Sequence, residues 1–521
     1  MCGRFHLDCS RLRRFKNKTC RLVLVALVMV AGGCASLDAR PEIERSAASV
    51  HHAMGTSADS LLLDLQSART KTAELLLGTL SADEAVQVAL LNNPMARAAM
   101  LNVGVSRADF VQSTLFSNPT LALSFRFPDG GGLANFETAL SQNIAELWLI
   151  PARREVARRQ LERTILRAAN TVAAIAFDAR RAYTRATRIR EEEAILSDTL
   201  GIIERLFEVA ELRRQAGTGN EVDVNLARTK KLEAETNLRN ARLATLEAYS
   251  ELARVLGISD SPATLRLGDA LPEPNDWPMS PQALLQIAIG NRLDLRVAEQ
   301  SVGEAQARAK QERVRFLKSV EVGVALERGE RRSRGDRNWV QETIYDSLQS
   351  GQLTPPNFTP RQSQGSNTIV GPTIGIELPL WDQNQAQIAK ADRLLEQTIQ
   401  LRDALHVNVA QDIHARLARA RTSAENALFY RDKQLPAAER SVALSREAYK
   451  AGRLPFLSIL EAERTYLAAR SGYLDAVESA ALATVELEQV TGRPASVLLA
   501  APALNIVSQE IEDLTLSKVK P

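Results

Sequence analysis

Apolar and small residues recur with alternating spacings of four and three along two segments of the chain. The first stripe comprises Ala234, Leu238, Ala241, Thr245, Ala248, Leu252 and Val255. The second comprises Ala469, Tyr473, Ala476, Ala480, Ala483, Leu487 and Val490. A period of 3.5 residues specifies a left-handed coiled coil, and small side chains let helices approach closely. Two coiled-coil helices are therefore predicted.

The two stripes belong to a larger internal repeat. Each position of the second stripe follows its counterpart in the first at an offset of 235, whereas residues 81–102 resemble residues 280–301 at an offset of 199. The larger offset is explained by an insertion of loop composition at 327–367. Each half is predicted to contain a leading helix (about 81–115 and 281–317), two strands, a long helix (about 152–214 and 384–450) and a returning helix.

A glycine separates each long helix from its returning partner. Ala216-Gly217 and Ala451-Gly452 occupy the same place in the two halves, and each pair is predicted to form a helix-turn-helix tip, at about 215–221 and 451–456. At 1.5 Å per residue, the long helices would each span about 90–100 Å. Gly201 and Pro436 also correspond, and both are predicted to bend their helices locally.

Four short stretches alternate apolar and polar residues. In residues 120–127, Leu121, Leu123 and Phe125 alternate with polar or small residues, and residues 135–144, 320–327 and 372–378 behave alike. We expect strands at about 120–144, 320–327 and 369–380, each long enough to cross an outer membrane when tilted. An ordinary half-buried soluble hairpin is the alternative. Because open strand edges are not viable in lipid, four membrane strands would require several copies of the chain, and three copies would supply twelve strands.

The N-terminus has the organisation of a bacterial secretory signal. A segment rich in arginine and lysine precedes a short apolar run, Leu22 to Val30, and the sequence "AGGC" ends at Cys34. The predicted division is a lipoprotein signal peptide at 1–33 with Cys34 acylated, and a lipid-anchored tail at 34–80. An ordinary signal peptide cleaved nearby is the alternative. No later segment reaches the 18 apolar residues of a transmembrane helix.

The remaining boundaries follow from the repeat. The predicted order is a first repeat at 81–257, a linker at 258–280, a second repeat at 281–492 and a C-terminal segment at 493–521.

Composition and motifs exclude several functional classes. The chain has 65 basic and 62 acidic residues, so it shows no charge footprint for nucleic-acid binding. Phosphate-loop, zinc-protease, serine-hydrolase and dinucleotide-binding motifs are absent from the sequence, which argues against an enzyme with a cofactor. His51 and His52 lie in a polar stretch, and the spacing of His406 and His414 does not favour a metal site.

Several segments carry a resemblance to a known family. They are "ALLNNP" (89–94), "AIGNRLDL" (288–295), "GIELPLWDQNQAQIAKA" (375–391), "LPAAERSVALSREAYKAG" (435–452) and "FLSILEAERTYL" (456–467). With the matching segments of the first half, they make residues 80–495 resemble the TolC-type outer-membrane efflux proteins. The resemblance is to the lipoprotein branch that serves resistance-nodulation-division pumps.

The resemblance implies a mainly α fold with a small β membrane domain. Long antiparallel coiled-coil helices and four strands per protomer would assemble as a homotrimer, whose twelve-stranded barrel continues into a twelve-helix periplasmic tunnel. The linker and the C-terminal segment would form an equatorial region. Such a protein is a passive duct of the outer membrane, joined by a periplasmic adaptor to an inner-membrane pump. The tips at Gly217 and Gly452 would dock the adaptor.

The family's periplasmic gate matches this sequence in part. Its tyrosine and aspartate correspond to Tyr449 and Asp223, but Leu454 occupies the basic position and Arg453 precedes it. Of the acidic residues that narrow the pore, one matches Glu461 and Ser458 replaces the other. Solvated polar groups at the helix tips are the alternative.

Other residues fit the two membrane boundaries. Trp148 and Trp381 stand at matching strand-to-helix junctions, as aromatic anchors of a membrane interface do, although packing at a bend would also explain them. Five arginines lie between Arg328 and Arg337, either near anionic lipopolysaccharide or in a solvated loop.

Two questions stay open at this level. A lipid-anchored periplasmic coiled-coil scaffold without a pore would explain the heptads, but not the paired strands. The transported substrate could be heavy-metal ions or drugs.

Overall fold

The computed structural model describes residues 37–500, apart from 56–60, 62, 128–133, 260, 262–264, 333–338 and 356–362. The chain divides into two compact units, residues 1–38 and 39–521. Every helix and strand described below belongs to the second unit.

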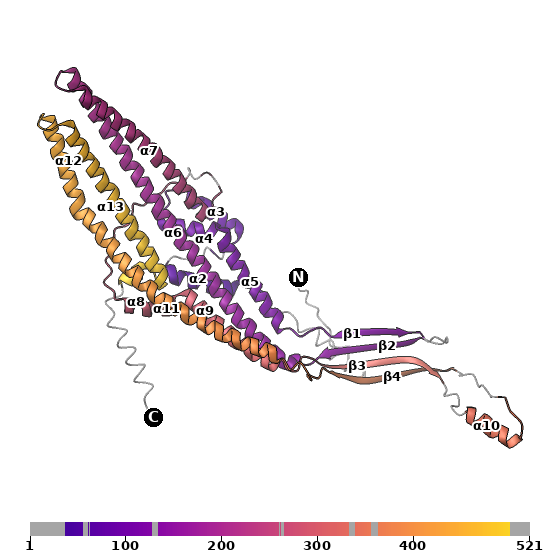
Figure 1. Cartoon of the computed structure of the whole chain (residues 1–521). Helices are drawn as coiled ribbons and strands as arrows, with labels where there is room; N and C mark the ends of the chain where they lie inside the picture. Colours follow the sequence, from indigo (N-terminus) through magenta and orange to yellow (C-terminus); the bar gives the residue numbers. More distant parts are fainter. Residues whose placement is uncertain are drawn as a thin grey trace, which may run out of the picture. The chain divides into compact units, whose positions relative to one another are not determined.

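The first repeat, from residue 81 to 257, contains four helices and two strands among the described residues. In chain order these are α4 (Ala82–Asn92), α5 (Pro94–Thr114), β1 (Thr120–Arg126), β2 (Asn135–Asn143), α6 (Glu146–Gln215) and α7 (Glu221–Leu256). Helix α6 has 70 residues, a length of about 105 Å, and α7 returns along it (Figure 1).

The second half repeats this order with additions. Its elements are α8 (Pro281–Asn291), α9 (Leu293–Val314), β3 (Val320–Arg332), α10 (Trp339–Ser350), β4 (Ser363–Ile376), α11 (Gln385–Phe429), a π-helical turn (Tyr430–Gln434), α12 (Leu435–Lys450) and α13 (Phe456–Thr491). Both ends of α8 correspond to those of α4 at an offset of 199, and both ends of α13 correspond to those of α7 at an offset of 235. The helices therefore repeat with the two offsets found in the sequence.

Matching residues start and stop the repeated helices. Ser81 and Ser280 cap α4 and α8, each accepting a hydrogen bond from a backbone N–H of the first turn. Gly257 and Gly492 end α7 and α13 in the left-handed region, with φ of 72° and 67°. Each predicted leading helix is in fact two helices. The break falls at Asn93 in the first half, where proline follows, and at Arg292 in the second.

The predicted long helices are confirmed with two differences. Helix α6 begins at Glu146, ahead of the expected start, and remains helical through Pro151. The second long helix contains the π-helical turn Tyr430–Gln434 just before Pro436. Proline lacks the N–H that would continue the α-helical ladder, so an irregularity here was expected. At Gly201, by contrast, α6 continues as regular α-helix.

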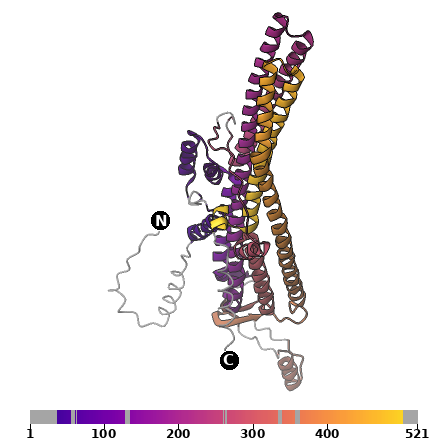
Figure 2. The ribbon, with the colours of Figure 1, turned by 90° about the vertical axis from the view of Figure 1, so that its left-hand side faces the viewer.

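The predicted coiled-coil stripes face inward. In α7, Ala234, Leu238 and Leu252 are buried and the other stripe positions are half-buried. In α13, every stripe position is buried except Tyr473, which is half-buried. Helix α7 packs along α6, and α13 packs along α11 and α12 (Figures 1 and 2).

The four strands form one antiparallel sheet in the order β1-β2-β3-β4. Strands of the two halves meet at the β2–β3 pair, where Leu140 lies opposite Val324. Strands β1 and β4 are the edges of this sheet. Strand β4 ends at Ile376, short of the predicted end at 380, whereas β3 and β4 extend further into the insertion than expected.

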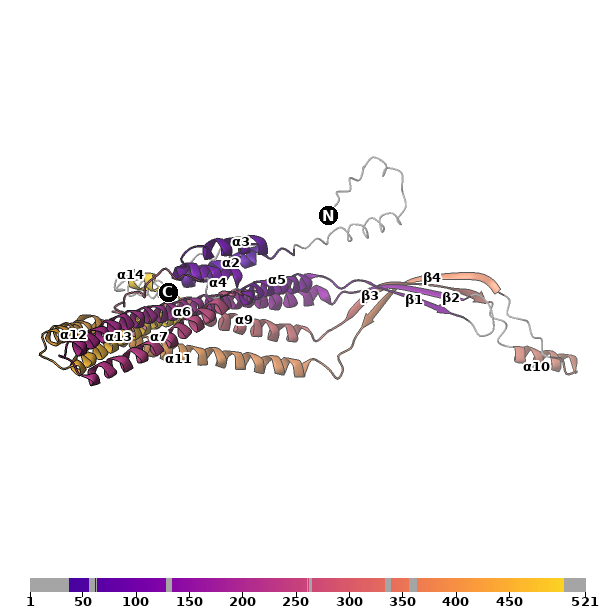
Figure 3. The same cartoon turned by 90° about the horizontal axis from the view of Figure 1, so that it is seen from above.

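The insertion at 327–367 has loop composition, but it is not a loop throughout. Residues to Arg332 and from Ser363 extend the β3–β4 pair, and α10 lies between them. In the first half, the corresponding connection comprises only residues 127–134. Helix α10 follows the strand ends that lie away from the long helices (Figures 1 and 3).

The prediction that 34–80 is a tail also needs correction. Two helices, α2 (Arg40–Met54) and α3 (Leu65–Leu76), lie in this segment. Helix α2 packs against α6, where Ser46 Oγ donates to the carbonyl of Ile165 at 3.2 Å and Arg45 pairs with Glu162 at 2.8 Å. The apolar side chains on the buried face of α2 were too few to signal packing from the sequence: Ala47, Val50, Ala53 and Met54.

Candidate functional site

One face of the sheet is apolar across all four strands. Because residues directly opposite in an antiparallel pair point to the same side, the register defines this face. Its apolar members are Leu121, Leu123 and Phe125 of β1, Phe136 and Leu140 of β2, Val320, Val322, Val324 and Leu326 of β3, and Val370, Pro372, Ile374 and Ile376 of β4. The polar Thr138 and Gln142 of β2 also lie on this side. Most of the apolar side chains are exposed, and Ile374 is 71% exposed. A soluble half-buried hairpin would have such a face covered.

The opposite face of the sheet is polar or small except for Ile369, which lies opposite Glu327. Ser124, Glu137 and Glu327 lie on it with several alanines and glycines, and Arg126 pairs with Glu137 at 3.0 Å. The glycines allow close packing. A Cβ at Gly323 would lie 2.5 Å from the Leu140 carbonyl oxygen and 2.8 Å from Thr373 Oγ1. The sheet therefore separates an apolar side from a hydrophilic side.

The ends of the apolar face carry aromatic and charged residues. Trp148 lies half-buried in the first turn of α6, which follows β2, and Trp381 lies 88% exposed after β4. At the other end, Arg328 lies opposite Phe136 and Thr368, on the same side as the apolar residues. The two tryptophans therefore occupy the equivalent junctions expected from the sequence.

The two helix tips have the same backbone design. In each, the glycine adopts a positive φ, 77° at Gly217 and 71° at Gly452. The next residue donates its N–H to a carbonyl five residues earlier, Thr218 to Arg213 and Arg453 to Ala448. Each glycine also donates to the carbonyl three residues earlier. These are the two hydrogen bonds of a Schellman motif, which explains why both helices stop at an Ala-Gly pair.

The two tips pack on each other through a shared cluster. Its buried members are Ala210, Val224, Ala227, Tyr449, Phe456, Ile459 and Leu460. The rings of Tyr449 and Phe456 lie 5.6 Å apart. Arg213 of α6 places its guanidinium 4.7 Å from the Tyr449 ring centre, and its Nη1 donates to the Tyr449 carbonyl at 3.2 Å. The sequence repeat could not reveal Arg213, because its counterpart in the second half is Ala448.

The residues matched to the family's gate are not joined to each other within the chain. Tyr449 is buried in the tip cluster. The Asp223 backbone N–H bonds to Asn220, which caps α7, and Arg453 is exposed. Among the described residues, no hydrogen bond or ion pair links these three side chains. Leu454, which precedes Pro455, is exposed as well.

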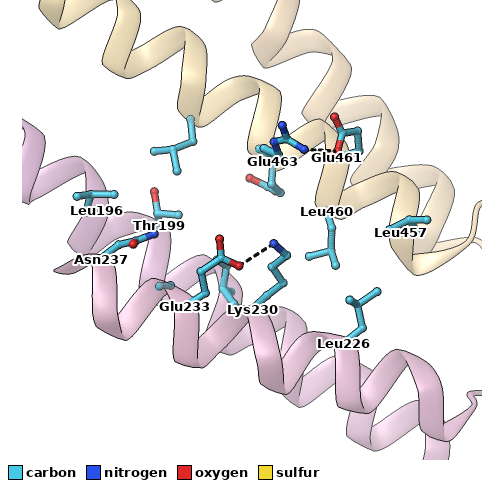
Figure 4. A pocket seen from close by; sticks show the side chains of 14 residues that line it. Leu196, Thr199, Leu226, Lys230, Glu233, Asn237, Leu457, Leu460, Glu461 and Glu463 are labelled. Carbon is cyan, nitrogen blue, oxygen red and sulfur yellow. Dashed lines mark hydrogen bonds and ion pairs between the residues drawn. The ribbon is translucent and has the colours of Figure 1, made fainter. Parts of the chain in front are cut away.

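A cavity of about 570 Å³ lies just behind the tips, between α6, α7 and α13 (Figure 4). Lys230 pairs with Glu233 on α7 at 2.7 Å, and Glu461 pairs with Arg464 on α13 at 3.6 Å. Leu226, Leu457 and Leu460 contribute apolar wall. Glu461 therefore faces this cavity, whereas Ser458 is half-buried on the preceding turn.

A second cavity, of about 550 Å³, lies where α6, α13 and the linker meet. Arg180 bridges Glu488 at 2.8 Å and Asp83 at 3.2 Å. The carboxylate of Glu488 also accepts the N–H of Ala495, at the start of α14 (Ala495–Ala500), at 2.6 Å. Burial raises the pKa of Glu488, and the opposing charge of Arg180 reduces this effect. The cluster ties the C-terminal segment to the repeat.

The described residues offer few other chemical sites. They contain no group of three or more histidine, cysteine, aspartate or glutamate side chains placed to hold a metal ion. His51 and His52 are exposed in the last turn of α2, His406 is half-buried and His414 is exposed on α11. No helix in the described part of the chain is long and apolar enough to cross a membrane. Cys34 and the predicted signal peptide lie outside the described residues.

Sequence comparison finds a family match in the second half of the chain. Residues 284–493 match the family described as "Outer membrane efflux protein". A 166-residue stretch, 31% of the chain, is 25% identical to the cobalt-zinc-cadmium resistance protein CzcC of Cupriavidus metallidurans. The match spans 39% of the length of that relative.

The fold is that of solved outer-membrane channels. The chain is similar to the CmeC outer membrane channel of Campylobacter jejuni, with a TM-score of 0.61 and 14% identity over 83% of this chain and 88% of that one. The open-state MtrE outer membrane channel of Neisseria gonorrhoeae gives 0.60 and 18% over 79% and 88%. These likenesses confirm the mainly α fold with four strands, and they belong to channels rather than enzymes.

Proposed function

Because residues 284–493 match the outer membrane efflux protein family and the fold is that of solved outer-membrane channels, we propose that this chain is the outer-membrane exit duct of a tripartite efflux system. It conducts passively what an inner-membrane resistance-nodulation-division pump exports through a periplasmic adaptor. It lies in the outer membrane, extends into the periplasm and is anchored by a lipid on Cys34.

The apolar face of the sheet is the observation that carries this proposal. Four strands expose a continuous apolar surface on one side and leave the edges β1 and β4 without partners in the described chain. In lipid, unpaired strand edges must be closed. Three copies, joined β1 to β4, would make a twelve-stranded barrel with its polar face toward the lumen. A pore-free scaffold has no use for such a surface.

The duct is tested by isolating the protein from outer membranes and reconstituting it in planar bilayers. We expect a trimer that resists detergent and dissociates on heating, and stepwise conductance after reconstitution. A soluble elongated monomer, obtained after removal of the lipid, would favour the scaffold and overturn the duct. Radiolabelled palmitate tests the anchor separately, since replacing Cys34 by serine should abolish the label.

The helix tips are the proposed docking site of the adaptor. Gly217 and Gly452 expose two turns of equivalent backbone shape, and a trimer would present six of them around one opening. Disulfide crosslinking between cysteines placed at Thr218 or Arg453 and a partner adaptor tests this assignment. Crosslinks that form equally well at exposed positions of the long helices far from the tips would contradict it.

The gate would have to form between copies of the chain. Tyr449 is occupied within its own tip by Arg213 and Phe456, so Asp223 and Arg453 are available to a neighbouring protomer. Replacing Asp223 by alanine should raise single-channel conductance. The matched control is Glu221→Ala, which removes a nearby exposed charge paired with Arg214. Equal conductance in the wild type and the Asp223 variant would remove the gate.

Heavy-metal cations are the proposed substrates. The support is the similarity to CzcC, a protein whose name states resistance to cobalt, zinc and cadmium. Deletion of the gene should sensitise cells to these ions, and the intact gene should restore growth. Drugs are the second candidate, favoured by the scarcity of metal-binding side chains, with only six methionines and five histidines in 521 residues. Sensitivity confined to organic compounds would select them.

A further inference from the structure

Helix α10, in the connection between β3 and β4, has an apolar surface that no other described element covers. Ile344 and Leu348 are 54% and 78% exposed, and Leu353, just after the helix, is 98% exposed. Ile344 and Leu348 are four residues apart and share one helix face, while Asp346 lies two residues from each, on the opposite face. Helix α10 is therefore amphipathic, with its apolar side outward.

Asp346 is exposed as well, and the chain that follows α10 turns back onto the side of Thr343 and Ser347. After the helix ends, Gly351 adopts a φ of +63° and the chain turns back. Thr354 donates its N–H to Ser347 Oγ at 3.1 Å, and its hydroxyl lies 2.7 Å from Ser347 Oγ and 3.3 Å from the Thr343 carbonyl. This arrangement holds the helix by local contacts and leaves Ile344 and Leu348 exposed.

We propose that α10 lies on the outer leaflet of the outer membrane and binds its anionic glycolipid. This inference rests on the proposed membrane position of the sheet. The long helices leave the sheet at one end and α10 leaves it at the other, so a periplasmic helical part puts α10 outside the cell. Amphipathic helices with exposed aliphatic side chains and a flanking aromatic residue, here the exposed Tyr345, are typical of membrane interfaces.

Charge selects the lipid over a second copy of the chain. Residues 328–362 contain six arginines and four acidic residues, so copies gathered over one pore would repel each other. An anionic surface would attract each copy. Arg328 already marks where the apolar face of the sheet ends, and it points to the same side as Val324 and Leu326. Along the chain, the apolar residues of β3 are followed by Arg328 and then by α10, which is the order expected where the chain leaves the hydrocarbon for the headgroup region.

Single cysteines labelled with an environment-sensitive fluorophore test the proposal on the full chain. Ile344→Cys and Asp346→Cys report the two faces of α10, and Val324→Cys reports the sheet. The parent chain without an added cysteine gives the labelling background. The trimer is placed in nanodiscs of phosphatidylethanolamine, with or without lipopolysaccharide, and is quenched with a nitroxide lipid or with aqueous iodide.

We expect the nitroxide lipid to quench position 344 at least about twofold more than position 346, and lipopolysaccharide to increase the difference. Iodide should show the reverse order. Equal access of iodide to both positions would overturn the proposal. Protection of position 344 from both quenchers, with crosslinking between copies, would overturn it in favour of a cap over the pore. If the nitroxide lipid does not quench position 324, the proposed membrane position of the sheet is wrong. This conclusion does not depend on the result for α10.

Discussion

The first and second halves of the chain share their order of elements but not their regularity. Helix α6 runs unbroken for 70 residues, whereas its counterpart is divided into α11, a π-helical turn and α12. Helix α6 packs against α2, α4, α5, α7, α9 and α13, while α11 packs mainly against α8, α9 and α13. The difference in regularity follows from Pro436 beside the π-helical turn, because α6 has Gly201 at the corresponding position and continues as regular helix.

The connections between the two strands of each half also differ. The first half joins its strands through residues 127–134, and the second carries α10 between its strands. Both halves, however, contribute two strands to the apolar face. The repeat conserves the apolar face of the sheet and the coiled-coil stripes. The two halves differ in segments outside these surfaces.

The largest expected effect tests whether the two halves are equivalent in the sheet. Val324→Arg and Leu140→Arg place a charge on directly opposed positions of the apolar face, one from each half. Each should cost about 2–4 kcal/mol at the bilayer midplane and reduce the yield of heat-dissociable trimer in outer membranes.

Ala325→Arg and Ala139→Arg are the matched controls, because these alanines are also directly opposed but lie on the polar face. They should leave trimer yield nearly unchanged and alter conductance. If the alanine variants lose more trimer than the Val324 and Leu140 variants, the assignment of the two faces is reversed.

A smaller effect distinguishes the irregular helix from the regular one. A Cβ on Gly472 of α13 would lie 2.7 Å from the ring of Tyr430, in the π-helical turn. Gly472→Ala should therefore destabilise the protein by about 1–3 kcal/mol. Near Gly201 of α6 the closest atom would be Arg205 Nη1 at 3.7 Å, so Gly201→Ala should stabilise by about 0.5–1 kcal/mol.

Thermal unfolding in detergent, followed by circular dichroism, measures both variants. Tyr430→Ala combined with Gly472→Ala should cost less than the sum of the single changes, because the clash is removed. If Gly472→Ala leaves the free energy of unfolding unchanged, the position of the Tyr430 ring does not require a glycine at residue 472.

The tips should respond alike in the two halves. Gly217→Ala and Gly452→Ala each force a side chain into the left-handed region, at a cost of about 1–2 kcal/mol. Asparagine at either position should cost less, because it tolerates this conformation. Unfolding measurements that find alanine and asparagine equivalent would contradict the Schellman geometry as the cause.

The smallest effect is a difference in pH dependence between the returning helices. Burial raises the pKa of Glu488 in α13, so its contribution to stability is fully present below its ordinary value of 4.5 and is lost as pH rises through the raised pKa. The hydrogen bond from Arg254 lowers the pKa of Glu251 in α7, so its contribution is present above 4.5 and is lost as pH falls through the lowered pKa.

Glu488→Gln and Glu251→Gln, compared with wild type in unfolding experiments across pH, should therefore show opposite trends. The effect of Glu251 will be small because its pair with Arg254 is exposed to solvent. If the effect on stability changes with pH in the same direction in both variants, burial does not control the pKa of Glu488.

The sequence by itself determined the features that depend on neighbours along the chain. The spacing of Ala234, Leu238 and Ala241 sets a helix face, the Ala-Gly pairs set the reversals, and alternation sets which strand residues share a side. These are local consequences of the helix and strand periods and of the conformational freedom of glycine. The two offsets then predicted that both halves would share one plan.

Only the tertiary structure decided how distant segments meet. Leu140 faces Val324, Arg213 covers Tyr449, and α2 packs on α6, although none of these pairs has a signal in the local pattern. Strand register and helix contacts between distant segments are chosen by the packing of the whole chain. The outward apolar side of α10 was decided in the same way. Its amphipathic pattern is local, but Ile344 and Leu348 stay exposed because Thr354 turns back onto Ser347 and no other described element covers them.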